Sequence, residues 1–264
     1  MSKHIERAAL ITGGSGGIGR ALADVFAKHG HDIILVARNE EKLDIAKREL
    51  EEQYNIVCET MVLDLSKQDS AYQLYRSLAV NNWIIDVLVN NAGFGTWGEF
   101  FEIAPTRIVE EMNLNVVSLT LLTNLVLKDM IQRRSGKIMN VASTAAYQPG
   151  PMMAVYYATK AYVLSFSEAL AKEVEGTAVT ITTLCPGPTE TGFQGNAGMG
   201  KAHLFKKAFL MDAMTVAESA YEGLMKGKRV VIPGIMNTIV STIVKFLPKT
   251  LVLSMVAVLH KRRK

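Results

Sequence analysis

The chain has 264 residues, of which 49% are hydrophobic and 20% charged, so it is not intrinsically disordered. Its two cysteines, Cys58 and Cys185, exclude a disulfide-stabilised scaffold and fit the cytoplasm, and its five histidines are not spaced as metal ligands, so we expect no metal site. The net charge is +4, but residues 261–264 are all basic, and the neutral remainder argues against nucleic-acid binding.

Apolar runs alternate with segments of helical periodicity. Strands are predicted at residues 8–11, 32–37, 56–63, 87–89, 137–141, 179–184 and 230–232. Helices are predicted at residues 17–28, 40–54, 70–81, 105–133 and 155–174, and another opens at the capping box Thr215-Val-Ala-Glu218. Strands that are apolar throughout are covered on both faces. The pattern predicts one α/β domain over residues 1–264, a Rossmann-like doubly wound parallel sheet of about seven strands with helices on both faces.

Neither a leader nor a membrane span is expected. The first apolar run, residues 8–11, is too short for a signal peptide, and no uninterrupted apolar run reaches the roughly 18 residues of a spanning helix.

A glycine-rich turn lies between the first strand and the first helix. Glycines allow the backbone to approach a pyrophosphate closely, and the helix N-terminus offers free N–H groups and the positive end of its dipole. A glycine cluster alone is a weak signal, but the strand–turn–helix context favours dinucleotide binding. The predicted cofactor contacts in this turn are Gly13, Ser15, Gly16, Gly17, Ile18 and Gly19.

Arg38 follows the second strand, where nucleotide-binding proteins select their cofactor. NAD sites usually carry an acidic residue near this position, which binds the ribose 2′-hydroxyl. Here a guanidinium follows the strand instead, and its fork of donors suits a 2′-phosphate. Arg38 could also be a solvated residue at the start of the next helix, but the chemistry favours NADP(H).

Four further motifs follow in order. They are Asn90-Asn91-Ala92-Gly93 after the fourth strand, Asn115 in the long helix, Ser143 after the fifth strand, and Tyr156 with Lys160 in the next helix. Together with the glycine-rich turn they resemble the short-chain dehydrogenase/reductase family, in its shorter single-domain branch, near bacterial reductases related to ketoacyl and steroid reductases. The resemblance covers residues 7–233, and the combination of motifs is more specific than any one of them.

The chemistry of these residues can be argued directly. Tyr156 and Lys160 are four residues apart and share a helix face. A phenol has a pKa near 10, and a neighbouring ammonium group lowers it, so Tyr156 can act as general acid or base. Ser143 can donate a hydrogen bond to the substrate oxygen. The resemblance implies that Lys160 also holds the nicotinamide ribose and that Asn115 supports a water that passes protons to Lys160.

Two neighbours compete for these roles. Tyr157 adjoins Tyr156, but only Tyr156 stands four residues before a lysine and thirteen after Ser143. Asn113 precedes Asn115 by two residues, and the family pattern of asparagine followed by valine matches only Asn115.

The resemblance implies further cofactor contacts after other strands. Asp64 and Leu65 would meet the adenine, and the Pro-Gly turn after the sixth strand would border the nicotinamide. The remaining predicted contacts are Asn91, Ala92, Gly93, Pro186, Gly187, Thr189 and Thr191. Cys185, beside this turn, has no adjacent base and is interpreted as a buried, inert thiol.

The resemblance implies a substrate lid at about residues 189–214, where a flexible glycine-rich stretch precedes an apolar segment. An apolar pocket could be lined by Phe193, Phe205, Met211 and Met214 on one side and by Phe94, Trp97, Gln148, Met152 and Met153 on the other. Each of these could also be ordinary core packing. No cluster of Arg or His suits an acidic substrate, so we expect an apolar ketone, aldehyde or alcohol.

An apolar, basic helical extension is predicted at about residues 235–264. Apolar residues recur at helical spacing up to Leu247, Pro248 ends that helix, and residues 251–259 are apolar before the basic tail. The segment could lie on an anionic membrane, or it could pack on its own domain or on a partner subunit.

These features predict a cytoplasmic NADP(H)-dependent oxidoreductase that acts on an apolar carbonyl or alcohol. The family resemblance implies a homodimer or homotetramer, and the C-terminus could add a peripheral membrane contact. The alternative is an NADPH-binding regulatory or membrane-surface protein without turnover.

Overall fold

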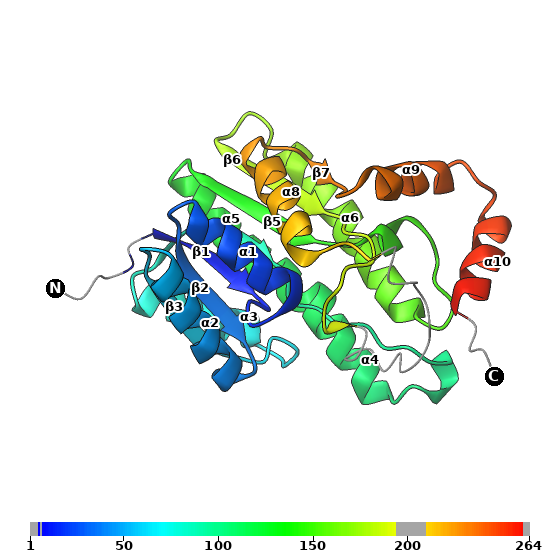
Figure 1. Ribbon diagram of the computed structural model, residues 1–264, viewed down its shortest axis with the longest axis horizontal. Coiled ribbons are helices and arrows are strands. Elements are labelled where there is room, and N and C mark those ends of the chain that lie inside the picture. The colour runs from blue at the N-terminus through cyan, green and yellow to red at the C-terminus, as the bar shows by residue number, and fades with distance from the viewer. Residues whose placement is uncertain (1–4, 6, 194–209, 261–264) are drawn as a thin grey trace.

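The computed structural model describes residue 5, residues 7–193 and residues 210–260. Its centre is a parallel sheet of seven strands in the order β3-β2-β1-β4-β5-β6-β7 (Figure 1). The strands are β1 (Arg7–Thr12), β2 (Asp32–Ala37), β3 (Cys58–Val62), β4 (Ile84–Asn90), β5 (Gly136–Val141), β6 (Val179–Leu184) and β7 (Val230–Val231). The predicted fold class is confirmed, and the strand order reverses between β1 and β4, where doubly wound sheets bind ligands.

Helices cover both faces of the sheet. One face carries α1 (Gly17–Lys28), α2 (Glu40–Gln53) and α8 (Ala213–Met225), and the other carries α3 (Ser70–Val80), α5 (Leu119–Gln132) and α6 (Ala154–Glu173). Successive strand residues serve the two faces in turn: Ala9 and Ile11 of β1 pack with α1 and α8, whereas Ala8 and Leu10 pack with α3 and α5. This double burial explains why the strands are apolar throughout.

The predicted helix at residues 105–133 contains a change of helical type. It consists of α4 (Pro105–Met112), the π-helical turn η2 (Asn113–Ser118) and α5. This helical run is long and apolar enough to cross a membrane, but Leu122, Val126 and Met130 are buried against the sheet. It is therefore a core helix of the α/β domain.

The predicted capping box at Thr215 is wrong. Helix α8 begins at Ala213, and the carboxylate of Asp212 accepts hydrogen bonds from the backbone N–H of Thr215, at 2.9 Å, and from its hydroxyl, at 3.3 Å. A carboxylate is the better partner for the positive end of the helix dipole, so the helix starts earlier than predicted.

The remaining elements surround the carboxyl ends of the strands. They are the short helices η1 (Phe100–Glu102) and η3 (Thr144–Tyr147), and the C-terminal helices α9 (Ile235–Val244) and α10 (Lys249–His260). Helices α9 and α10 extend from β7 along one end of the molecule (Figure 1).

Candidate active site

A cavity of about 1340 Å³ lies at the carboxyl ends of the strands. Most predicted site residues line it. They are Gly13, Ser15, Gly16, Gly17, Ile18, Arg38, Asp64, Leu65, Asn91, Ala92, Gly93, Ser143, Tyr156, Lys160, Pro186, Gly187, Thr189 and Thr191. Gly19 and Asn115 do not line the cavity but support residues that do.

Hydrogen bonds close the glycine-rich turn onto the end of β4. The Thr12 hydroxyl accepts the backbone N–H groups of Asn91 and Ala92, both at 3.0 Å. The Asn91 side-chain amide donates to the carbonyl of Thr12, at 2.9 Å, and to that of Gly13, at 3.3 Å. The two strand ends that flank the switch point are thereby held together.

The beginning of α1 fits a pyrophosphate. Its first turn holds no acidic residue, and Gly16, which precedes the helix, makes no side-chain cap, so the N–H groups there are available to an anion. Gly13 and Gly17 have φ values of +68° and +54°, which favour glycine. The residues present thus suit the dinucleotide that the sequence predicts.

Gly19 is required by close packing. A Cβ atom at this position would lie 2.2 Å from the Gly13 carbonyl oxygen and 2.5 Å from the Asn91 amide nitrogen. We expect Gly19→Ala to lower the free energy of unfolding by about 1–3 kcal/mol, because the turn must move to admit the methyl group. Urea unfolding measures this change. Gly16→Ala is the control, since a Cβ there meets nothing within 4 Å and φ is −178°; equal stability losses in both variants would contradict the packing argument.

Two basic side chains line the cavity at the end of β2. Arg38 follows the strand, and Lys42 lies in the first turn of α2, where its N–H donates to the Asn39 side chain at 2.7 Å. Lys42 was missed by the sequence analysis. The spacing of four residues between Arg38 and Lys42 could have indicated that they lie together. Both residues reach the cavity, however, only because of the turn between the strand and the helix.

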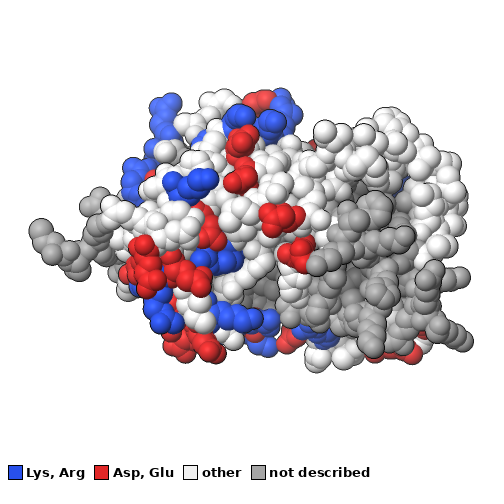
Figure 2. All heavy atoms as spheres, viewed as in Figure 1, with Lys and Arg blue, Asp and Glu red and all other residues white. Residues whose placement is uncertain are grey.

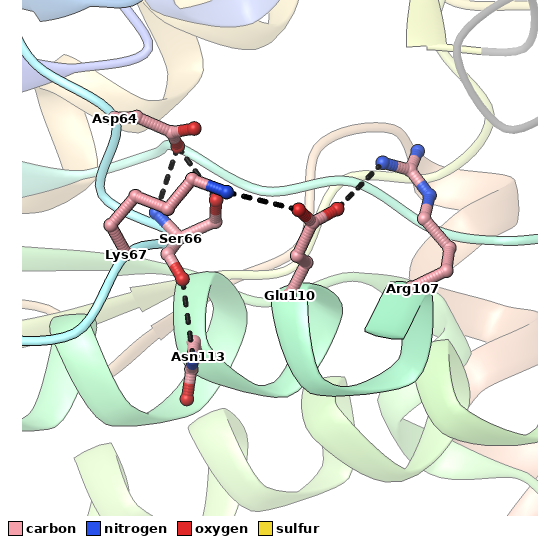
Figure 3. Close-up of polar contacts among 6 residues, drawn as sticks. All are labelled: Asp64, Ser66, Lys67, Arg107, Glu110 and Asn113. Atoms are coloured by element: carbon pink, nitrogen blue, oxygen red, sulfur yellow. Dashed lines mark hydrogen bonds and ion pairs between the residues drawn. The ribbon is translucent and has the colours of Figure 1, made fainter. Parts of the chain in front are cut away.

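Asp64, at the same end, belongs to a polar network (Figure 3). Burial favours its neutral form, but hydrogen bonds from the Ser66 hydroxyl (2.7 Å) and N–H (3.0 Å), together with the charge of Arg38, hold the pKa of Asp64 below its usual value. Further along, Lys67 pairs with Glu110, and Asn113 donates to the Ser66 carbonyl. Asn113, the competitor of Asn115, therefore ties the beginning of η2 to the loop after β3.

Asn115 faces the other way, toward the predicted catalytic residues. Its buried amide donates to the Phe94 carbonyl (2.8 Å) and to the Thr159 hydroxyl (3.1 Å), and accepts the Phe94 N–H (3.1 Å). A Cβ atom on Gly93 would lie 3.0 Å from the Asn115 oxygen and 3.5 Å from the Lys160 nitrogen. The missing side chain of Gly93 thus leaves room for both polar groups close to the backbone at this point. The π-helical turn that presents Asn115 is of a kind frequent at functional sites.

Ser143, Tyr156 and Lys160 lie close together in the lining of the cavity. Ser143 is hydrogen-bonded to the Tyr156 phenol and also accepts the N–H of Ala145 at 3.1 Å. Lys160 is buried, and its ammonium group donates to the Val141 carbonyl at 2.7 Å and lies 5.8 Å from the centre of the Tyr156 ring. The two helix residues share one face, as their spacing predicts.

The pKa of Tyr156 differs from our expectation. We expected Lys160 to lower it, but burial raises the pKa of Tyr156 to about 12, and the hydrogen bond from Ser143 only partly offsets this. Burial likewise lowers the pKa of Lys160 to about 8. Low polarity disfavours both charged forms, and the ammonium group is directed to Val141 rather than to the phenol.

The other end of the cavity is largely apolar. Phe193, Met211, Gln148 and Met153 line it as predicted. The prediction is wrong for four residues: Phe94 is buried beneath the Arg107 guanidinium, Met214 is exposed on α8, and Trp97 and Met152 lie outside the lining. Phe205 lies outside the described residues.

Helices α9 and α10 complete this apolar end, which the sequence analysis did not foresee. Residues that line the cavity from them include Ile235, Met236, Val240, Val244 and Val256. The helical periodicity was recognised, but the sequence did not show which surface the helices contact. Their position supports the alternative in which the extension packs on its own domain.

The two ends of the predicted lid are joined. The Met211 N–H donates to the Pro188 carbonyl, and the Glu190 N–H donates to the Met211 carbonyl, both at 2.9 Å. Asn237 of α9 packs here as well: a Cβ atom on Gly187 would lie 2.4 Å from its amide. Residues 194–209, the central part of the predicted lid, lie outside the described residues, so the lid stays a prediction.

The fold and this cavity define a dinucleotide-binding α/β protein. The sequence model of the short chain dehydrogenases matches residues 7–202. The chain therefore belongs to the short-chain dehydrogenase/reductase family, as the resemblance implied.

Similar proteins carry the names of dehydrogenases and reductases. The chain is 36% identical to hydroxysteroid dehydrogenase-like protein 1 of Gallus gallus, over 70% of this chain and 56% of that protein. It is 35% identical to the very-long-chain 3-oxoacyl-CoA reductase of Bos taurus, over 67% of this chain and 58% of that protein. The match thus spans little more than half the length of these relatives. A human relative, 31% identical over 70% of this chain and 57% of its own, is named inactive hydroxysteroid dehydrogenase-like protein 1.

A solved structure agrees with the fold and with a nicotinamide cofactor. The short-chain dehydrogenase of Sphingobium yanoikuyae, in complex with NADPH, superimposes with a TM-score of 0.81 and 28% identity. The match covers 92% of this chain and 96% of the other. Membership of the family and the likeness to this NADPH-bound neighbour support a nicotinamide cofactor.

Proposed function

We propose that the protein is an NADP(H)-dependent reductase of apolar ketones or aldehydes, able to run in reverse on the alcohols. The observation that carries this proposal is the meeting of Ser143, Tyr156 and Lys160 in one cavity with the glycine-rich turn. The cofactor, when bound, supplies or accepts the hydride. The protein residues orient the reactants and move the proton.

Each side chain has a proposed role. Ser143 donates a hydrogen bond to the carbonyl oxygen as negative charge develops there. The Tyr156 hydroxyl gives its proton to that oxygen, and its raised pKa keeps it protonated at neutral pH, as an acid for reduction requires. Lys160 holds the nicotinamide ribose and returns a proton toward Tyr156. Asn115 positions the region around Gly93 and Lys160.

The preference for NADP(H) rests on Arg38 and Lys42. Both line the cavity at the end of β2, where the ribose of the adenosine half would lie. A 2′-phosphate there would meet two cations, and Arg38 could bind it with two parallel hydrogen bonds.

The proposal of an apolar substrate rests on the residues that line the apolar end of the cavity. Phe193, Met211 and the apolar residues of α9 and α10 form that wall. The name of the bovine relative, a very-long-chain 3-oxoacyl-CoA reductase, fits a site built for an apolar chain.

Assembly and location are part of the same proposal. Apolar side chains are exposed on the long helices, among them Val109 and Met112 on α4, Val117 on η2 and Tyr162 on α6. Such a surface supports a homodimer or homotetramer. Two buried free cysteines, Cys58 and Cys185, support the cytoplasm.

A binding protein without turnover is the second candidate, and the inactive human relative is the observation that favours it. NADPH oxidation against ketones and aldehydes graded by apolar size separates the two. We expect turnover that rises with apolar size. Tight NADPH binding with no turnover on any of them would favour the second candidate.

A further inference from the structure

The C-terminal helices α9 and α10 are attached to the domain along one side. Val252 and Val256 of α10 and Ser241 of α9 are buried. The Lys245 ammonium group lies 4.7 Å from the centre of the Tyr147 ring, and Asn237 packs against Gly187. The helix pair is therefore held in place by its own domain.

The other side of the helix pair is an exposed apolar surface. Phe246 is 83% exposed and Ile235 is 81% exposed. At least half of the surface is also exposed at Met236, Ile243, Met255 and Val258. On the face that Figure 2 shows, the described side chains at the end that carries α9 and α10 are almost all uncharged. Soluble surfaces rarely leave so many large apolar side chains together without a partner.

Basic and acidic residues are unevenly distributed between the C-terminal part of the chain and the rest. Residues 223–264 contain nine Lys and Arg and no Asp or Glu. The other 222 residues therefore hold 20 of the 29 basic residues and all 25 acidic ones, a net charge of −5. The stretch of chain that carries the apolar surface therefore contains basic and no acidic residues, which is complementary to anionic lipid. A second copy of the same surface would instead meet it with like charges.

The exposed surface is continuous with the cavity. Ile235, Met236 and Val240 are exposed and also line the cavity. An apolar molecule that reaches these side chains from outside is therefore already at the lining of the cavity that also contains Tyr156.

We propose that α9 and α10 lie on an anionic membrane surface, so that the cavity takes its apolar substrate from the bilayer. With 10 and 12 residues, the helices are too short to span and would lie in the interface. The docking itself is independent of the proposed function, and the delivery of substrate rests on it.

Vesicle flotation of the full chain tests the docking. We expect binding to vesicles of phosphatidylcholine with phosphatidylserine, weaker binding without phosphatidylserine, and loss of binding as salt screens the charges. Phe246→Glu should weaken binding to the anionic vesicles at least about tenfold, because it places a charge where an apolar ring enters the lipid. Val80→Glu, at a 79% exposed residue at the end of α3, is the matched control and should bind as the unchanged protein does.

Two results would overturn the docking. One is the absence of binding to anionic vesicles by the unchanged protein. The other is equal weakening by both variants. If Phe246→Glu instead splits an oligomer of the free protein, measured by light scattering, while vesicles are not bound, the surface joins copies of the chain.

Rates of turnover on two kinds of substrate distinguish the delivery of substrate from the bilayer from catalysis itself. Phe246 does not line the cavity, so Phe246→Glu should leave the rate on a water-soluble ketone unchanged and lower the rate on a long-chain ketone dissolved in anionic vesicles. If Phe246→Glu and the unchanged protein turn over the ketone in vesicles at equal rates, the proposed delivery of substrate from the bilayer is wrong. Absence of turnover on every ketone would count against the reductase and leave the flotation result intact.

Discussion

Tyr156→Phe is expected to lower kcat for ketone reduction by about 10²–10⁴-fold while NADPH affinity stays nearly unchanged. The phenyl ring keeps the shape of the site, but it lacks the hydroxyl that is hydrogen-bonded to Ser143 and that we propose as the proton donor to the substrate oxygen. Steady-state kinetics with NADPH, and NADPH titration by fluorescence, measure the two quantities separately.

Tyr157→Phe is the matched control. Tyr157 is adjacent, also lines the cavity, and has a pKa raised by burial. Its spacing from Lys160 is three residues, whereas Tyr156 has the spacing of four and is hydrogen-bonded to Ser143. We expect its kcat to stay within a few-fold of the unchanged protein; a large loss in Tyr157→Phe together with retained turnover in Tyr156→Phe would reverse the assignment.

The same site predicts a pH dependence. Burial lowers the pKa of Lys160 to about 8, so its ammonium form is complete well below pH 8 and is lost as the pH rises through that value. Because kcat/KM reports the ionisation of the free enzyme, kcat/KM for reduction should fall above about pH 8. Tyr156, with a pKa of about 12, stays protonated throughout this range. A profile that is flat to pH 10 would show that the charge of Lys160 is not needed.

Arg38→Asp is expected to reverse the cofactor preference. Hydrogen bonds to charged groups contribute about 1.5–3 kcal/mol, so the loss of Arg38 alone should weaken NADPH by roughly tenfold to a hundredfold. The new carboxylate repels the 2′-phosphate and can accept hydrogen bonds from the ribose hydroxyl of NADH, which should bind more tightly. Dissociation constants for both cofactors measure the change.

Arg48→Asp, on the exposed side of α2, controls for net charge. It changes the charge of the chain by the same amount, but Arg48 does not line the cavity. Both dissociation constants should stay close to those of the unchanged protein. The assignment of Arg38 fails if Arg38→Asp weakens the two cofactors equally.

The sequence by itself determined the fold class and most residues of the candidate site. The bounds of α1, β2 and β6 coincide with the prediction, because apolar periodicity and turn residues are local properties of the chain. Residues that directly follow different parallel strands can be predicted to lie near one another, because the carboxyl ends of these strands meet at one edge of the sheet. The cavity that unites the glycine-rich turn with Ser143, Tyr156 and Lys160 follows from this rule.

Features that depend on contacts between residues distant in the sequence were decided only by the tertiary structure. The pKa of Tyr156 is set by how deeply the cavity buries it, which spacing along a helix does not reveal. The position of α9 follows from its contacts with Gly187 and Tyr147, which lie 50 and 98 residues before their partners Asn237 and Lys245. Periodicity shows that a helix has an apolar face, whereas long-range packing decides whether that face meets its own domain, and here the packing leaves the other face exposed.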